Sequence, residues 1–230
     1  ISLHAARAEG AAHHPVTARI LPGQRVLLDG PSGIGKSRLM AVLTRDAPLA
    51  EGTARLAGAE PSSLRPVALT ARIAHLAQRP AILRGTLAEN LRLAAPDACD
   101  AALRQVLTAA DLEGWALAGA GLATSINETG TNLSGGLRQR IAIARLLLRP
   151  AEVLIFDEAF SEIDDAACRR ILAAIDARRP DTTRIFIAHS GPAREGQFDQ
   201  RITLTSSAPI FLSSRGEAPY QREKAREKAV

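Results

Sequence analysis

Gly30-Pro31-Ser32-Gly33-Ile34-Gly35-Lys36-Ser37 is the stretch that decides the fold of this chain of 230 residues. It matches the pattern G-x-x-x-x-G-K-[ST] at every defined position. The glycines permit positive φ, so successive backbone N–H groups can point at phosphate oxygens at the start of a helix. Lys36 adds a positive charge for the β and γ phosphates, and the Ser37 hydroxyl is a ligand for Mg²⁺. The stretch therefore predicts a site for a nucleotide phosphate chain.

The sequence on either side of this loop supports the interpretation. Arg25-Val26-Leu27-Leu28 has the character of a buried strand, and the residues from Lys36 to Thr44 have a helical pattern. A glycine-rich turn without a ligand is the alternative. The strand–loop–helix order argues against it.

A second stretch carries two carboxylates. Val153-Leu154-Ile155-Phe156 predicts a central parallel strand covered on both faces, and Asp157 and Glu158 follow at its carboxyl edge, where open α/β sheets bind ligands. Asp157 is placed to hold Mg²⁺ and Glu158 to act as general base toward water. Two acids after a strand can also cap the next helix, but the phosphate loop upstream favours the catalytic interpretation.

Further motifs carry a family resemblance. Leu133-Ser134-Gly135-Gly136, with Arg138-Gln139-Arg140 after it, is close to the signature L-S-G-G-Q-R-Q-R of ATP-binding cassette (ABC) proteins. Gln78 stands where that family has its Q-loop glutamine. Ser161-Glu162-Ile163-Asp164 is similar to the D-loop S-x-L-D, and His189 to the switch histidine. The chain thus resembles an ABC nucleotide-binding domain.

The resemblance covers about residues 15–205 and implies an α/β fold of the P-loop NTPase class. An ABC-type ATPase has a mixed β core, a parallel sheet with flanking helices and a helical subdomain. We expect the domain over 1–205, with a RecA-like core at 1–78 and 150–205 and the helical subdomain, with the signature, at 79–149. Residues 206–230 are expected to form a partly disordered C-terminal tail.

Local patterns place several elements within these parts. Helices are predicted from Asp97 through Leu107, from Leu137 to Arg149 and from Asp164 to Arg179. A strand is predicted from Arg184 to Ala188.

The resemblance also implies a role for each motif. Nucleotide binding falls to Gly30, Pro31, Ser32, Gly33, Ile34, Gly35, Lys36, Ser37 and Arg38. Glu158, His189 and Gln78 are implied to be catalytic, and Ser37, Gln78 and Asp157 to bind Mg²⁺. Leu133, Ser134, Gly135 and Gly136 are implied to complete, in trans, the ATP site of a second cassette.

Three of these roles have plain alternatives. His189 alone reads as an ordinary hydrogen-bonded residue after a strand, and Gln78 alone as a polar loop residue. Asp164 fits a helix cap as well as a D-loop residue.

Two stretches indicate the exporter subclass. Residues 78–91 are similar to the Q-x-P-x-L-x-x-G-T-I-x-E-N-I segment of exporter cassettes, and Thr124 to Leu133, with Glu128 and Gly130, resembles their X-loop. The implied function is ATP hydrolysis that drives export through ATP-dependent dimerisation. A soluble cassette acting on nucleic acid or ribosomes, and a poorly hydrolysing regulatory cassette, are the alternatives.

The chain departs from the family pattern near the base of the nucleotide. The stretch before Trp115 contains no Phe, Trp or Tyr, so the aromatic that stacks on adenine is missing, and His13 or His14 are the available substitutes. Arg38 replaces the threonine that often follows Ser37. Leu137 replaces the signature glutamine. Neither substitution removes a main phosphate donor.

Composition agrees with one globular domain. Hydrophobic residues make up 46% and charged residues 23%, with two cysteines and a net charge of +5. The basic residues are scattered, so nucleic acid is not expected as a partner. No apolar run of about 18 residues occurs, and the chain opens on Ile1, so we expect an excised piece whose membrane domain precedes it in the same polypeptide. The expected location is the cytoplasmic face of a bacterial inner (plasma) membrane. The transported substrate, and the choice between homodimer and heterodimer, stay open.

Overall fold

A five-stranded parallel sheet forms the centre of the computed structural model, which describes residues 1–78, 80–127 and 132–206. Its order is β10-β3-β9-β8-β5. The strands are β3 (Arg25–Asp29), β5 (Ile73–Leu76), β8 (Val153–Asp157), β9 (Thr183–Ile187) and β10 (Gln200–Thr203). The predicted tail, and the X-loop residues Glu128 and Gly130, lie outside the described residues.

Side chains that alternate along these strands separate into two cores. Leu154 and Phe156 face one side and pack with the helical part, while Val153 and Ile155 face the other and pack with α1 (Lys36–Thr44). Such a continuous apolar run is what a parallel strand covered on both faces requires. Phe156 is completely buried and stacks on Phe186 of β9 at 4.9 Å between ring centroids, and burial of each such side chain contributes about 1.5–3 kcal/mol.

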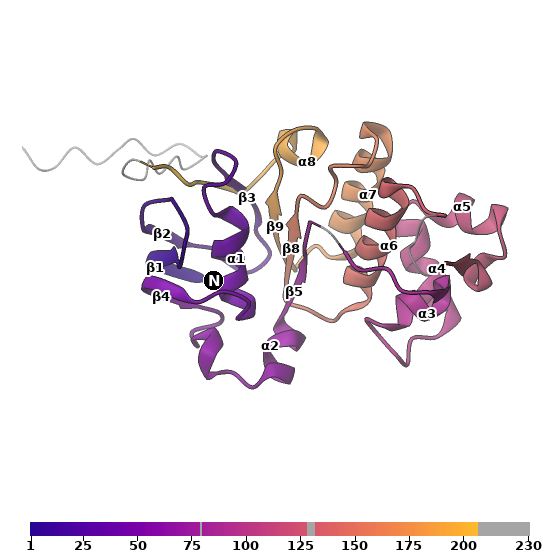
Figure 1. Ribbon diagram of the computed structural model, residues 1–230, viewed down its shortest axis with the longest axis horizontal. Coiled ribbons are helices and arrows are strands. Elements are labelled where there is room, and N and C mark those ends of the chain that lie inside the picture. The colour runs from indigo at the N-terminus through magenta and orange to yellow at the C-terminus, as the bar shows by residue number, and fades with distance from the viewer. Residues whose placement is uncertain (79, 128–131, 207–230) are drawn as a thin grey trace, which may run out of the picture.

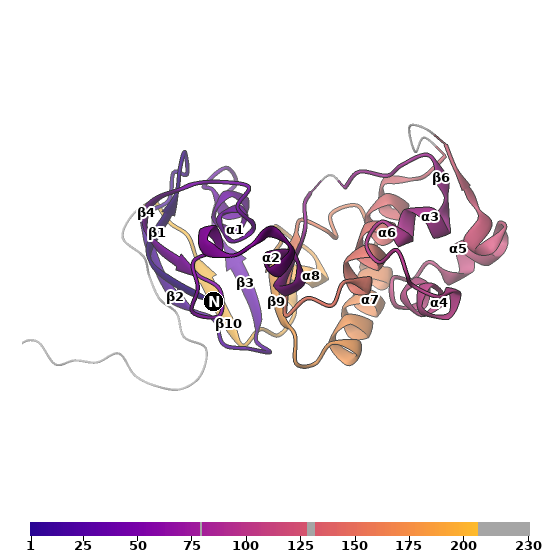
Figure 2. The same cartoon turned by 90° about the horizontal axis from the view of Figure 1, so that it is seen from below.

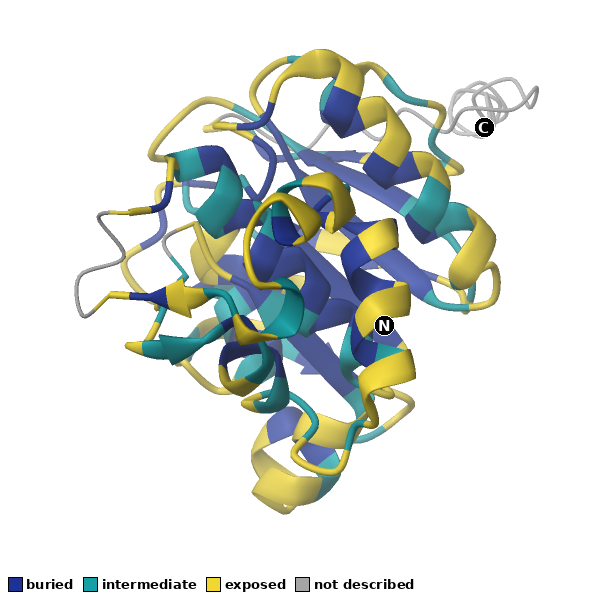
Figure 3. Ribbon diagram, turned by 90° about the vertical axis from the view of Figure 1, so that its right-hand side faces the viewer, coloured by how far each residue is buried: buried dark blue, intermediate teal, exposed yellow. Residues whose placement is uncertain are grey.

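The two faces of the sheet are covered differently. In both Figure 1 and Figure 2, α1 lies on one side of β3 and β9, whereas α6 (Gly135–Leu148) and α7 (Asp165–Arg178) lie on the other. Figure 3 shows the dark-blue buried strands between helices whose outer faces are yellow. The start of α1 and the start of α6 are therefore separated by the thickness of the sheet.

A second, antiparallel sheet of order β2-β1-β4 covers α1. It consists of β1 (Ser2–Ala8), β2 (Val16–Arg19) and β4 (Leu49–Arg55). The fully buried Ala6 and Ala8 are small enough for this sheet to approach α1 closely. A 3₁₀ turn at Pro61–Ser63 and helix α2 (Pro66–Arg72) then lead into β5. The parallel and antiparallel sheets together form the mixed β core that was predicted.

The helical part contains α3 (Leu87–Arg92), α4 (Asp100–Ala109), α5 (Glu113–Ala118) and α6, with a 3₁₀ turn at Gly121–Ala123. A capping box between Thr86 and Glu89 starts α3. The prediction that the next helix begins at Asp97 was wrong: α4 begins at Asp100 because Cys99 is extended. The short pair β6 (Gly85–Thr86) and β7 (Ser125–Ile126) was not predicted.

Caps explain the other boundary differences. Ser134 accepts a hydrogen bond from the Leu137 N–H, so α6 begins at Gly135, two residues before the predicted start, and it ends at Leu148. Asp164 accepts from the Ala167 N–H, so α7 begins at Asp165 and ends at Arg178. The strand predicted at 184–188 is β9, one residue earlier at each end, and α8 (Pro192–Glu195) follows it. Across the described ranges, no helix has both the length and the apolar character needed to cross a membrane.

Candidate nucleotide site

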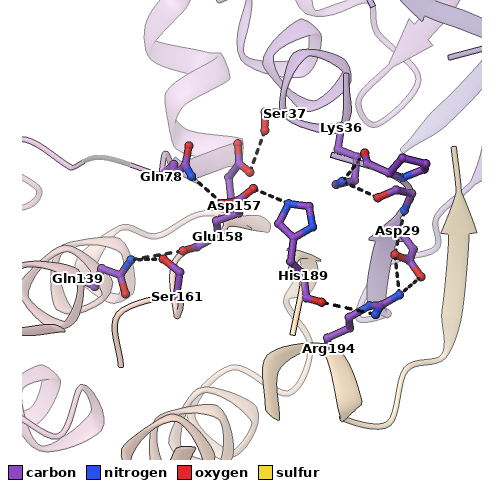
Figure 4. A network of polar contacts seen from close by, with 12 residues as sticks. Asp29, Lys36, Ser37, Gln78, Gln139, Asp157, Glu158, Ser161, His189 and Arg194 are labelled. Atoms are coloured by element: carbon purple, nitrogen blue, oxygen red, sulfur yellow. Dashed lines mark hydrogen bonds and ion pairs between the residues drawn. The ribbon is translucent and has the colours of Figure 1, made fainter. Parts of the chain in front are cut away.

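The predicted polar groups meet at the carboxyl edge of four neighbouring strands. Lys36 and Ser37 follow β3, and Gln78 comes two residues after β5. Glu158 follows Asp157, the last residue of β8, and His189 comes two residues after β9. Since neighbouring parallel strands end at the same edge, residues far apart in the sequence become neighbours, as Figure 4 shows.

The phosphate loop has a conformation that requires glycine. Gly30, Gly33 and Gly35 have φ of 140°, 74° and 110°, values that other residues rarely adopt. A Cβ on Gly35 would lie only 2.6 Å from the Ala11 Cβ, whereas one on Gly33 would meet open space. Ile34 is buried beneath the loop. The loop is thus packed against the protein at Ile34 and Gly35 and faces open space at Gly33. This arrangement suits an anion held by backbone N–H groups.

Lys36 is held at the loop by backbone oxygens. Its Nζ donates to the carbonyls of Gly30 and Pro31 at 2.7 and 3.0 Å, and the residue is 5% exposed. Burial lowers the pKa of Lys36, and the charges of Asp29, Glu158 and Asp157 oppose that effect only in part. Carbonyl oxygens are weak partners for a buried ammonium group, so phosphate oxygens would replace them readily.

Ser37 and Asp157 form a set of oxygen atoms that fits Mg²⁺. The Ser37 hydroxyl donates to Asp157 Oδ1 at 2.9 Å, and Asp157 is 3% exposed. Mg²⁺ prefers such hard oxygen ligands and keeps several of its waters. His75 Nε2 lies 3.6 Å from Asp157 Oδ2 and is buried without a hydrogen-bond partner among the described residues.

Glu158 has an unusual backbone conformation, and hydrogen bonds hold both its backbone and its side chain. Its φ of 51° lies in the left-handed region, which costs a residue with a Cβ roughly 1–2 kcal/mol. Its N–H donates to the Ile187 carbonyl of β9 at 2.9 Å. Gln78 Nε2 donates to Oε2 at 2.6 Å, and His189 Nε2 lies 2.8 Å from Oε1, from the two sides seen in Figure 4. A cavity of about 140 Å³ adjoins Glu158 and His189 and offers room for water.

The signature is not brought to this loop. Ser134 is exposed at the start of α6, on the face of the sheet opposite α1. Gly135 and Gly136 pack against Glu162: a Cβ on Gly136 would lie 2.6 Å from the Glu162 carbonyl oxygen, and one on Gly135 would overlap the Glu162 carboxyl group. Leu133 is buried in the core of the helical part. The start of α6 and the phosphate loop of the same chain therefore lie on opposite sides of the sheet.

The structure shows a link between the signature helix and the acid pair that the sequence analysis missed. Gln139 is 3% exposed, and its Nε2 donates to Ser161 Oγ at 2.8 Å while its Oε1 accepts the Glu162 N–H at 2.9 Å. The signal in the sequence is a polar residue on the buried face of an apolar helix. Asp164 lies in the same segment and caps α7, which lowers the pKa of its carboxyl through the Ala167 N–H. The cap interpretation of Asp164 is thereby confirmed, and its D-loop role stays a prediction.

The structure distinguishes His13 from His14 near the base end of the site. His13 is 2% exposed and its Nδ1 lies 2.7 Å from the His14 carbonyl, so burial removes one of the two possible substitutes for the missing aromatic. His14 is exposed. Arg38, on the first turn of α1, lies against Gly10: its Nη1 would be 2.7 Å from a Cβ placed there. The Arg38 side chain therefore covers the backbone at Gly10, in the loop after β1.

Known proteins share this sequence and fold. The ABC transporter family model matches residues 13–161. The beta-(1-->2)glucan export ATP-binding/permease protein NdvA of Bradyrhizobium diazoefficiens is 37% identical over 169 residues, which are 74% of this chain and 28% of that protein. The ATP-dependent lipid A-core flippase of Neisseria meningitidis serogroup A is 36% identical over 178 residues, covering 77% of this chain and 29% of that protein.

A solved structure agrees with these relatives. A bacterial Atm1-family ABC exporter with ATP bound matches with a TM-score of 0.83 at 27% identity, over 89% of this chain and 37% of that one. The chain thus spans less than half the length of each of these three proteins. The predicted P-loop fold of the ABC ATPase type is confirmed. The chain belongs to the ABC transporter family.

Proposed function

We propose that this chain binds and hydrolyses ATP as the nucleotide-binding part of an exporter-type ABC transporter. The observation that carries the proposal is the meeting of Lys36, Ser37, Gln78, Glu158 and His189 at the carboxyl ends of four neighbouring strands. The printed names of the relatives, an export protein, a flippase and an exporter with ATP bound, support the exporter class.

Each group has a task in the proposed reaction. The loop N–H groups and Lys36 hold the phosphates, and Ser37 and Asp157 would hold Mg²⁺, which screens the phosphate charge when bound. Glu158 orients the attacking water and accepts its proton. Gln78 and His189 fix the Glu158 carboxylate, and His189 would also contact the γ-phosphate.

A second cassette is the proposed partner. The start of α6 lies across the sheet from the phosphate loop, so Ser134 and the N–H groups of Gly135 and Gly136 would face the γ-phosphate of another copy or of a paralogue. Two nucleotides would then be enclosed between two head-to-tail cassettes. Hydrolysis would loosen the pair and convert chemistry into motion.

A hollow beside the Gln78 loop fits contact with a membrane domain. It has a volume of about 360 Å³ and lies between β5, α3 and α6, with Leu76, Pro80 and Arg145 in its lining and the 55% exposed Leu93 at its edge. A hollow next to a catalytic loop, lined by apolar side chains and by the basic side chains of His75, Arg145 and Arg149, suits a segment that must sense nucleotide binding. The proposed location is the cytoplasmic face of the inner (plasma) membrane, with the membrane domain N-terminal in the same polypeptide.

ATP turnover by the wild type and by Glu158→Gln tests the proposal. The change keeps the size of the side chain and removes the base, so we expect kcat to fall roughly 10²-fold or more with ATP affinity unchanged. Glu152→Gln is the matched control, because Glu152 is exposed just before the other end of β8. Equal kcat values for the wild type and Glu158→Gln would remove Glu158 from the mechanism.

A further inference from the structure

An acidic side chain stands directly before the phosphate loop. Asp29 is the last residue of β3, and its Oδ1 accepts the Gly30 N–H at 2.8 Å. The carboxylate side chain is only 15% exposed. A negative charge at this place opposes phosphate binding, because like charges repel strongly where water is scarce. Positively charged side chains must therefore pair with the Asp29 carboxylate if the loop is to hold an anion.

Two arginines from distant parts of the sequence supply these cations. Arg194 Nη2 donates to both Asp29 oxygens, at 3.1 and 2.9 Å, and Arg201 Nη1 donates to Oδ2 at 3.0 Å. Partial burial is the largest single influence and raises the pKa of Asp29. The hydrogen bonds from Arg194 and the Gly30 N–H, together with the charges of both arginines, outweigh it and lower the pKa below its ordinary value. Asp29 is therefore ionised and paired at neutral pH.

The two arginines differ in what else they touch. Arg194 belongs to α8, which starts at Pro192 just after the His189 loop, and its Nη1 lies 3.4 Å from the His189 carbonyl oxygen. Arg201 reaches Asp29 from β10, and within the described ranges its guanidinium bonds to Asp29 alone. Figure 4 shows Arg194 between Asp29 and His189. Arg194 thus connects the His189 loop to Asp29, whereas Arg201 contributes only its positive charge to Asp29.

We propose that Arg194 is a positioning residue that fixes the His189 loop to the phosphate loop through Asp29. His189 Nε2 lies 2.8 Å from Glu158 Oε1, so a displacement of the His189 loop moves the group that orients the general base. The pairing joins residues 165 positions apart and links the entrance of the phosphate loop to the catalytic carboxylate. This inference rests on the proposed ATPase function.

The test compares Arg194→Gln with Arg201→Gln in the full chain. Each variant removes one positive charge from Asp29, but only Arg194→Gln breaks the link to the His189 loop. We expect Arg194→Gln to lower kcat roughly ten- to hundredfold with the KM for ATP changed less than about twofold, and Arg201→Gln to keep kcat within about twofold. Equal losses of kcat would show that both arginines only neutralise Asp29, and would overturn the inference.

A second readout does not depend on turnover. The ring resonances of His189 in nuclear magnetic resonance spectra should shift in Arg194→Gln and stay in place in Arg201→Gln. Equal shifts, or none in either variant, overturn the inference even if kcat falls. If the shift is specific to Arg194→Gln but the wild type hydrolyses no ATP, the structural link between Asp29 and the His189 loop stands, and its role in turnover fails together with the proposed function.

Discussion

Replacement of Gly136 by alanine is expected to destabilise the chain, whereas the same replacement at Gly114 is expected to stabilise it. Both glycines lie in helices, in α6 and α5, where alanine gains about 0.5–1 kcal/mol over glycine. At Gly114 the added Cβ meets nothing within 4 Å, so this gain is kept. The two sites therefore separate helix propensity from packing.

At Gly136 the added Cβ would lie 2.6 Å from the carbonyl oxygen of Glu162. That oxygen belongs to the backbone between Glu158 and α7, and overpacking against such a group costs about 1–3 kcal/mol. The net loss is then about 1 kcal/mol, so the two variants should differ by about 2 kcal/mol in unfolding free energy. Gly135→Ala meets only the flexible carboxyl end of Glu162, which can move aside, and should be close to neutral.

Thermal unfolding measures this difference directly. For a domain of this size, 1 kcal/mol corresponds to about 2–4 °C in Tm, so Gly136→Ala should melt about 4–8 °C below Gly114→Ala. A Gly136→Ala variant that melts at or above Gly114→Ala would refute the packing of α6 on the Glu162 segment.

Three further outcomes are expected. Cys99 is exposed and should react with a maleimide at pH 8. Cys168 is 1% exposed, and burial raises the pKa of its thiol to about 11, so it should react only after unfolding. Two maleimide adducts on the folded chain in mass spectra would contradict this. Because the pKa of Asp29 is lowered in the folded state, its contribution to stability is present above about pH 4 and is lost as the pH falls through the lowered pKa. Tm measured from pH 3 to pH 7 should therefore fall less steeply on the acid side for Asp29→Asn than for the wild type. The sequence before Trp115 offers no Phe, Trp or Tyr to stack on the base, which forgoes about 1 kcal/mol. KM for GTP should therefore lie within about fivefold of KM for ATP, and a much larger ratio in steady-state kinetics would show another base contact.

The central elements of the site follow from local sequence. The helix at Lys36–Thr44 agrees with its prediction at both ends, because the glycine pattern fixes its start and apolar residues at helical spacing fix its buried face. The strand that ends at Asp157 also follows from its sequence, since four consecutive apolar residues suit a short parallel strand covered on both faces. Local chemistry alone therefore locates the phosphate loop and the acid pair.

The contacts around these elements do not follow from local sequence. Nothing near Asp29 indicates Arg194, because their pairing depends on the order of β3, β9 and β10 in the sheet. Nor does the sequence distinguish His13 from His14 as a substitute for the missing aromatic: the packing of the loop after β1 against Gly35 buries His13. Sheet order and close backbone packing are properties of the assembled fold, which a single sequence does not display.

Mixing two inactive variants tests most directly the claim that one chain completes the nucleotide site of another. Lys36→Ala lacks phosphate binding but keeps its signature, and Ser134→Arg keeps its phosphate loop but blocks its signature. Each alone should have almost no ATP turnover, and mixing them should restore turnover, because a mixed pair contains one intact site. Turnover in the mixture that stays at the sum of the two separate rates would contradict the account.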